Sequence, residues 1–161
     1  MKENCLILDY IREYDMVQAN ISVLLDKGKI DEELYDSLST MDKLKRNEFI
    51  GKMQRDKPEL TDILTKGFDE NVDKLIEINK IKKNQILFRV KDAIFTKSKE
   101  LKYLKINENI QFAEKSLYFL MINFNTSENS NQFIQIFKCY DTLKVRGSKI
   151  DTTHKAYDFL E

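Results

Sequence analysis

The sequence predicts an α+β fold, with a helical N-terminal half, then antiparallel β-hairpins and a short C-terminal helix. Apolar residues recur at helical spacing as far as about residue 80. After Asn84, short runs rich in β-branched and aromatic residues alternate with turn residues. The 161 residues, 42% of them apolar, can bury one core. We expect a single domain, with residues 1–82 mainly helical, 85–147 in antiparallel sheet and 151–160 in the terminal helix.

Helical spacing and capping residues define the elements of the first half. Residues 4–14 fit either a strand or the start of an amphipathic helix, so both remain open there. Four helices are expected after it: from Met16 to Gly28, from Asp31 to Leu38, from Thr40 to about Gln54, and from Pro58 to about Lys80.

Three hairpins are expected in the second half, because β-rich runs lie close together along the chain. The first joins 86–90 to 93–96 through the two residues Lys91 and Asp92. The second pairs 109–112 with 117–124, and the third pairs 133–137 with 142–145 around Tyr140 and Asp141.

The charge is balanced overall but not along the chain. Lysine and arginine number 27, as do aspartate and glutamate, so no net field attracts nucleic acid. Residues 80–105, however, hold nine basic side chains against the acidic Asp92 and Glu100. This segment could bind a phosphate backbone, or its lysines could keep the edges of a sheet soluble.

Several classes of protein are disfavoured by what the chain contains. Cys5, Cys139 and His154 are too few and too scattered for a zinc site, a disulfide framework or a histidine-based triad. No apolar run approaches about 20 residues, and the N-terminus does not resemble a signal peptide. We therefore expect no membrane span and a cytoplasmic location, the host cytoplasm if the protein is viral.

Two carboxylates are placed where they could share divalent cations. Asp15 falls at the end of one candidate strand, and Asp92 falls at the tip of a candidate hairpin. Carboxylates on adjacent strands suit Mg²⁺, a hard cation that prefers oxygen ligands. The pair is the minimum needed for two-metal phosphoryl transfer.

Four blocks resemble, in order, the palm and fingers motifs of the B-family DNA polymerases. Asp15 and Ser22 match the family's Asp-Phe-x-Ser-Leu-Tyr-Pro-Ser block, with Asn20 at the sugar-screening tyrosine. Lys43, Asn47 and Gly51 match the fingers-helix motif in register. The remaining two blocks are 90–93, which resembles the Asp-Thr-Asp-Ser hairpin, and 114–118, which resembles a Lys-Lys-x-Tyr block.

The resemblance implies a palm-like domain and a set of roles. Asp15 and Asp92 would be the catalytic residues and the ligands of Mg²⁺. The residues implied to contact nucleotide or nucleic acid are Lys43, Asn47, Lys91, Lys115 and Tyr118. The site is either degenerate or completed by a partner chain. The compact, Lys/Asn/Ile-rich style is also similar to that of small phage proteins.

Each residue also has an ordinary structural interpretation. Asp92 suits a turn and Asp15 suits the N-cap of a helix. Lys43 and Lys115 suit solvated surfaces. The alternative functions are a non-catalytic protein–protein interaction protein, such as a phage accessory protein or inhibitor, and a nucleic-acid-binding module without metal chemistry. If the chain is a protein–protein interaction protein, we expect a protein partner.

Overall fold

The computed structural model describes residues 5–7, 10–118, 120–125, 133–139 and 142–146. The structure confirms the α+β class, with the helices ahead of the hairpins. The helices in the described residues are α1 (Ala19–Asp26), α2 (Glu32–Ser39), α3 (Lys43–Asp56) and α4 (Glu59–Ile78), followed by the 3₁₀ turn η1 (Lys83–Gln85). The strands are β1 (Cys5–Ile7), β2 (Ile11–Met16), β3 (Ile86–Val90), β4 (Ala93–Thr96), β5 (Phe112–Tyr118), β6 (Leu120–Asn125), β7 (Phe133–Cys139) and β8 (Thr142–Arg146). The expected terminal helix at 151–160 lies outside the described residues.

The strands form two four-stranded antiparallel sheets. The order is β3-β4-β2-β5 in one, called here the central sheet, and β1-β6-β7-β8 in the other. In the ambiguous N-terminal segment, residues 5–7 belong to β1 of one sheet and residues 11–14 belong to β2 of the other. The predicted hairpins β3–β4 and β7–β8 are confirmed.

The second predicted hairpin is wrong. The structure pairs β5 with β2, and it pairs β6 with β1 and β7. Residues 109–111 lie outside the strands, because the Asn107 side chain accepts hydrogen bonds from the Asn109 and Ile110 amides at 2.8 and 2.9 Å. That local turn satisfies backbone donors which a strand would have used.

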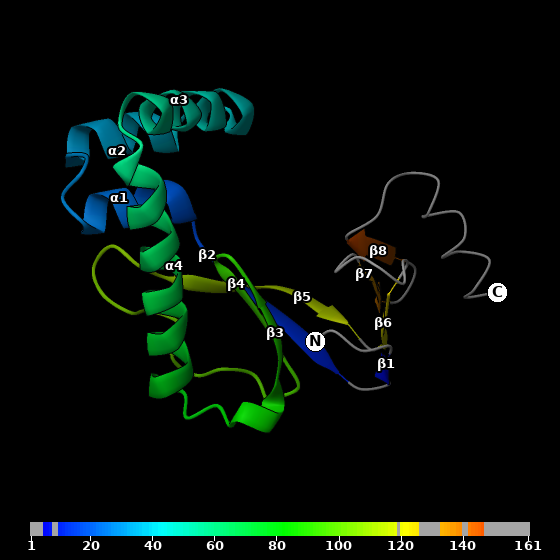
Figure 1. The fold of residues 1–161 in the computed structure, drawn as a ribbon. Helices are drawn as coiled ribbons and strands as arrows, with labels where there is room; N and C mark the ends of the chain where they lie inside the picture. The colour runs from blue at the N-terminus through cyan, green and yellow to red at the C-terminus, as the bar shows by residue number, and fades with distance from the viewer. Residues whose placement is uncertain (1–4, 8–9, 119, 126–132, 140–141, 147–161) are drawn as a thin grey trace.

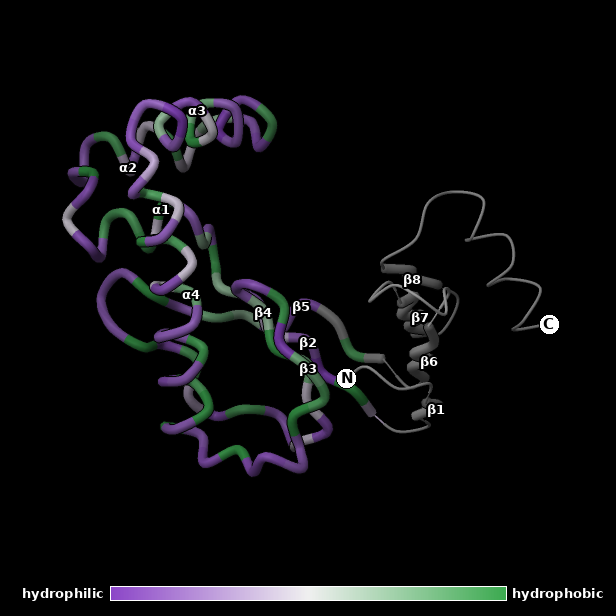
Figure 2. The backbone as a smooth tube through the Cα atoms, in the orientation of Figure 1, coloured by the Kyte–Doolittle hydropathy of each residue, from purple (hydrophilic) through white to green (hydrophobic). Residues whose placement is uncertain are grey.

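Helix α4 covers one face of the central sheet, and α1, α2 and α3 gather at its N-terminal end (Figure 1). Figure 2 shows hydrophilic and hydrophobic residues alternating along α4, as expected of a helix with one buried stripe. Leu64, Val72 and Leu75 of this stripe pack in one core with Tyr14 and Phe112 of the sheet.

A second, smaller cluster lies on the opposite face of the central sheet. It contains Ile11, Phe88, Ala93 and Phe95, and the two phenyl rings stack with their centroids 4.2 Å apart. Side chains alternate between the two faces of a strand. Since Tyr14 and Met16 belong to the core beneath α4, Asp15 projects from the other face.

Gly67 allows α4 to approach α1 closely. A Cβ atom at this position would lie 2.4 Å from Cγ1 of Val23. The residue lowers the helix propensity of α4 by about 1 kcal/mol relative to alanine. The close packing of the two helices explains why a glycine is accommodated there.

Candidate functional site

Asp15 lies one residue before the C-terminal end of β2, at the junction with α1. The interpretation of Asp15 as the N-cap of a helix is wrong, because Gln18 occupies that position and makes no side-chain capping bond. The helix starts at Ala19 rather than Met16, since Met16 is still hydrogen-bonded in the sheet and Gln18 turns the chain with a left-handed φ of 45°.

Asp92 lies at the tip of the β3–β4 hairpin, as predicted. Its neighbour Ala93 pairs directly with Asp15, and the Met16 amide donates to the Asp92 carbonyl at 3.0 Å. Lys91, the other tip residue, has a left-handed φ of 52°. The pairing of β2 with β4, the two middle strands, therefore brings the two predicted carboxylate residues to the same end of the sheet, called here the corner.

The two carboxyl groups interact electrostatically. Burial raises the pKa of Asp92, and the negative charge of Asp15 raises this pKa further. Oδ1 of Asp15 is buried and has no hydrogen-bond partner. A buried carboxylate oxygen without a donor is unfavourable, and a second carboxylate beside it adds repulsion. A cation at this corner would relieve both penalties.

Lys115 supplies part of that positive charge. Its Nζ lies 3.0 Å from Oδ2 of Asp15. Ala113 of β5 pairs with Asp15. The register of the ladder shifts between Glu13 and Tyr14, which leaves Lys115 as the extra residue of a β-bulge close to Asp15. Lys115 thus neutralises one oxygen of Asp15 and leaves the other without a donor.

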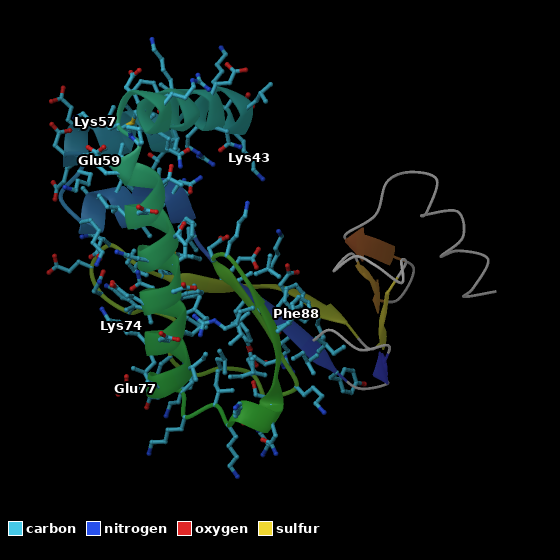
Figure 3. All side chains as sticks on the ribbon, in the orientation of Figure 1. Lys43, Lys57, Glu59, Lys74, Glu77 and Phe88 are labelled. Atoms are coloured by element: carbon cyan, nitrogen blue, oxygen red, sulfur yellow. The ribbon has the colours of Figure 1, made fainter. Side chains whose placement is uncertain are left out.

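The corner opens into a cleft of about 890 Å³ between the sheet and the helices. Its lining includes six of the seven predicted site residues, namely Asp15, Lys43, Asn47, Lys91, Asp92 and Lys115. Lys43 and Asn47 come from the first turns of α3, and Figure 3 shows Lys43 at the end of this helix. The volume lies in the range of small-molecule sites, about 300–1,000 Å³.

The backbone of Tyr118 lies at the end of β5 that is further from Asp15. Tyr118 ends β5, and its backbone pairs with Ile11 at the far end of β2 from Asp15. Three residues of strand separate it from Lys115, a distance of about 10 Å.

Other residues of the lining carried only weak signals in the sequence. Arg46 adds a fourth basic side chain, on α3. Gln18 accepts a hydrogen bond from the Tyr35 hydroxyl at 3.1 Å, which fixes the side chain of a residue with an unusual backbone conformation. Thr61 and Thr65 lie one turn apart on α4 and face the same cleft, a spacing visible in the sequence but not distinctive.

The cleft therefore contains two coupled carboxylates and several cations, without a larger acidic cluster. Within the part of the chain that the structure describes, no three His, Cys, Asp or Glu residues group as metal ligands. The carboxylate of Asp69, also in the lining, is 3.7 Å from Arg89. Asp15 and Asp92 could together hold a divalent cation, with its remaining positions filled by water or phosphate oxygens.

In the described residues, no helix is long and apolar enough to cross a bilayer. No curated protein and no solved structure matches the chain. The resemblance to B-family polymerases thus stays a hypothesis based on the residues themselves. The family model of the Bacteriophage PBS1 gene 130 protein matches residues 3–161. This match agrees with the phage-like style of the sequence, and the chain belongs to the family of the Bacteriophage PBS1 gene 130 protein.

Proposed function

We propose that the cleft binds a nucleoside triphosphate with Mg²⁺ and serves phosphoryl transfer on nucleic acid, as in a polymerase palm. The observation that supports this most strongly is the partnerless, buried Oδ1 of Asp15 beside the coupled carboxyl of Asp92. A surface ion pair or a simple turn aspartate would not require that arrangement. The site is either degenerate or completed by a partner chain.

The lining residues have distinct roles in this proposal. Asp15 and Asp92 hold the cation, which when bound supplies charge neutralisation and polarises a phosphoryl oxygen. Lys43 and Arg46 of α3 approach the cleft from the helical side and bind the phosphates. Asn47, one helical turn from Lys43, donates its amide to the sugar or a phosphate.

The hairpin and β5 complete the site. Lys91, at the exposed tip, is directed to the phosphates or to the nucleic acid. Lys115 forms an ion pair with Asp15 at 3.0 Å. The net positive charge of the lining, four basic residues against three aspartates, favours an anionic ligand that brings its own cation.

The proposal is tested by nucleotide binding and by primer extension. We expect Mn²⁺ or Mg²⁺ to raise the affinity for nucleoside triphosphate, and Asp92→Asn to abolish that cation dependence. Asp36→Asn is the matched control, because Asp36 is an exposed carboxylate on α2 outside the cleft lining. Incorporation of labelled nucleotide on a primer–template by the wild type, lost in Asp92→Ala, would support transfer itself. Equal binding with and without divalent cation would disprove the cation site.

A second function is favoured by α3, a helix that buries little apolar surface. Only Ile50 of its described side chains is fully buried, whereas Leu44 and Phe49 are 67% and 38% exposed. We propose, as the alternative, that α3 binds a protein partner and that the chain is a phage accessory protein or inhibitor. A photo-cross-linker at Leu44 should then label one host or phage protein that the same group at Lys52 does not. Equal labelling from both positions would remove this alternative.

A further inference from the structure

A second cavity, of about 1080 Å³, lies at the C-terminal end of α4. We call it the α4 groove. Its walls are the end of α4 with the segment leading to η1, and the loop between β4 and β5. Its lining consists of residues 77–82, Gln85, 98–103 and Lys105. Glu77, at this end of α4, and Lys43, beside the nucleotide cleft, mark opposite ends of the helical part in Figure 3.

The two walls are joined by side chain to backbone hydrogen bonds. Asn79 donates to the Tyr103 carbonyl at 2.7 Å and accepts from the Tyr103 amide at 3.0 Å. The Leu101 amide donates to the buried Tyr14 hydroxyl at 2.9 Å, which ties the loop to β2. The groove is therefore preformed and does not require ordering by a ligand.

The groove is strongly basic. Five exposed lysines line it against two glutamates, Glu77 and Glu100. The five are Lys80, Lys82, Lys99, Lys102 and Lys105. None of them forms an ion pair with any residue in the described ranges 10–118. Their charges are available to an external anion.

The groove also exposes an aromatic ring and an aliphatic side chain. Tyr103 is 52% exposed and Ile78 is 40% exposed. Nζ of Lys102 lies 5.5 Å from the centroid of the Tyr103 ring. Lysines beside an exposed ring are the combination that binds single-stranded nucleic acid, because phosphates pair with the ammonium groups and a base stacks on the ring.

Lys80 occupies a position that usually belongs to glycine. It follows the C-cap of α4 with a left-handed φ of 52°. Its amide donates to the Glu77 carbonyl, and the Ile81 amide donates to the Ile76 carbonyl, as in a Schellman motif. A lysine here costs backbone strain that a glycine would avoid. The alternative explanation, that lysines in this segment keep the edges of a sheet soluble, does not account for a lysine in a strained conformation that lines this groove.

We propose that the α4 groove binds the backbone of single-stranded nucleic acid, with Tyr103 stacking on a base. The two cavities are about 12 Å apart along α4, since Asp69 lines the cleft, Glu77 lines the groove and a helix rises 1.5 Å per residue. The proposal does not depend on the cation site, so it is tested in EDTA.

The test is fluorescence anisotropy of the full chain with a labelled oligothymidylate, its RNA counterpart and a duplex. The groove variant is Lys80→Gly with Lys102→Gln. Lys80→Gly keeps the left-handed cap, so the variant should fold normally. The control, Lys45→Gln with Lys52→Gln, changes the net charge equally on exposed α3 residues outside both cavities.

We expect the groove variant to bind more weakly and to reduce the slope of log affinity against log salt by about 1.4, since each lysine contributes about 0.7 on a single strand. The control should keep the wild-type slope. Tyr103→Ala should weaken binding by about 5- to 100-fold without changing the slope.

Three results would overturn the proposal. The first is no binding of any single strand by the wild type. The second is an equal loss in the groove variant and the control, which would show a general charge effect. The third is tighter binding of duplex than of single strand. A preference for DNA or RNA among the single strands identifies the natural ligand and leaves the groove assignment intact.

Discussion

Asp15 and Asp92 meet at one corner of the central sheet because β2 pairs with β4. Asp15 faces Ala93 across the ladder, and the amide next to Asp15 binds the Asp92 carbonyl at 3.0 Å. Their carboxyl groups are coupled, since the charge of Asp15 contributes to the raised pKa of Asp92. This coupling affects both the stability of the protein and its binding of cations.

Asp92→Asn is expected to stabilise the protein at neutral pH in the absence of divalent cations. The folded-state pKa of Asp92 lies above its unfolded value, so the folded protein binds the proton more tightly. The stability from this group is complete at low pH and is lost as pH rises through the folded pKa. Asp92→Asn removes the negative charge and so restores the stability that is lost at neutral pH. The thermal midpoint of the variant in EDTA should therefore be a few degrees higher than that of the wild type. A lowered midpoint would show that the carboxylate is stabilised by its surroundings.

Cation binding should weaken on acidification at a pH above the ordinary range for an aspartate. A proton and a cation compete for the Asp92 carboxyl, whose pKa is raised chiefly by burial and then by Asp15. The thermal shift produced by Mn²⁺ should therefore disappear as pH falls through that raised pKa. The Asp36→Asn control should show the same pH dependence as the wild type. A Mn²⁺ shift that is constant from neutral pH down to the usual aspartate pKa would contradict the assignment.

Lys115→Met should increase the affinity for the cation alone while reducing the affinity for nucleotide. Without the Lys115 ammonium, which lies 3.0 Å from Oδ2, both oxygens of Asp15 lack a cationic partner. A divalent cation can then take the place of the ammonium. The phosphates of the nucleotide lose one positive charge. Titration calorimetry with Mn²⁺ alone and with Mn²⁺ plus nucleotide separates the two effects. Weaker binding of Mn²⁺ alone would mean that Lys115 positions Asp15 and does not substitute for the metal.

Gly67→Ala should destabilise the fold although alanine is the better helix former. The added Cβ would lie 2.4 Å from Cγ1 of Val23, and such overpacking costs about 1–3 kcal/mol. In a Val23→Ala background the clash is removed, and Gly67→Ala should become stabilising by up to about 1 kcal/mol. Urea unfolding of the four proteins in this cycle gives the coupling directly. Equal effects of Gly67→Ala in both backgrounds would show that α1 and α4 are not in close contact there.

Local patterns predicted the elements that depend on neighbouring residues. Asp31 was expected to cap a helix, and its carboxylate accepts from the Leu34 amide at 2.8 Å. The β3–β4 hairpin has the predicted bounds, because the two turn residues and the β-rich runs beside them lie within a short stretch of chain. Thr40 was a less accurate start, since α3 begins at Lys43 after the N-cap Asp42.

Non-local pairing explains the errors. The sequence predicts strands at 109–112 and 117–124 that pair with each other, yet β5 and β6 belong to different sheets. No local signal records that β5 pairs with β2 while β6 pairs with β1 and β7. The α4 groove was visible only as an excess of lysine, because its walls come from segments joined by the Asn79 and Tyr14 hydrogen bonds.

Local patterns in the sequence are enough to predict the α+β class, the helices α1 to α4, two of the hairpins and the candidate residues Asp15 and Asp92. These follow from periodicity, capping and turn chemistry, which act over a few residues. The folded structure was needed to establish that Asp15 and Asp92 are neighbours, that Lys115 pairs with Asp15, and that Lys43 and Asn47 line the same cleft. Strand order and helix packing bring together residues distant in the chain, and the free energy that selects them comes from the whole buried core.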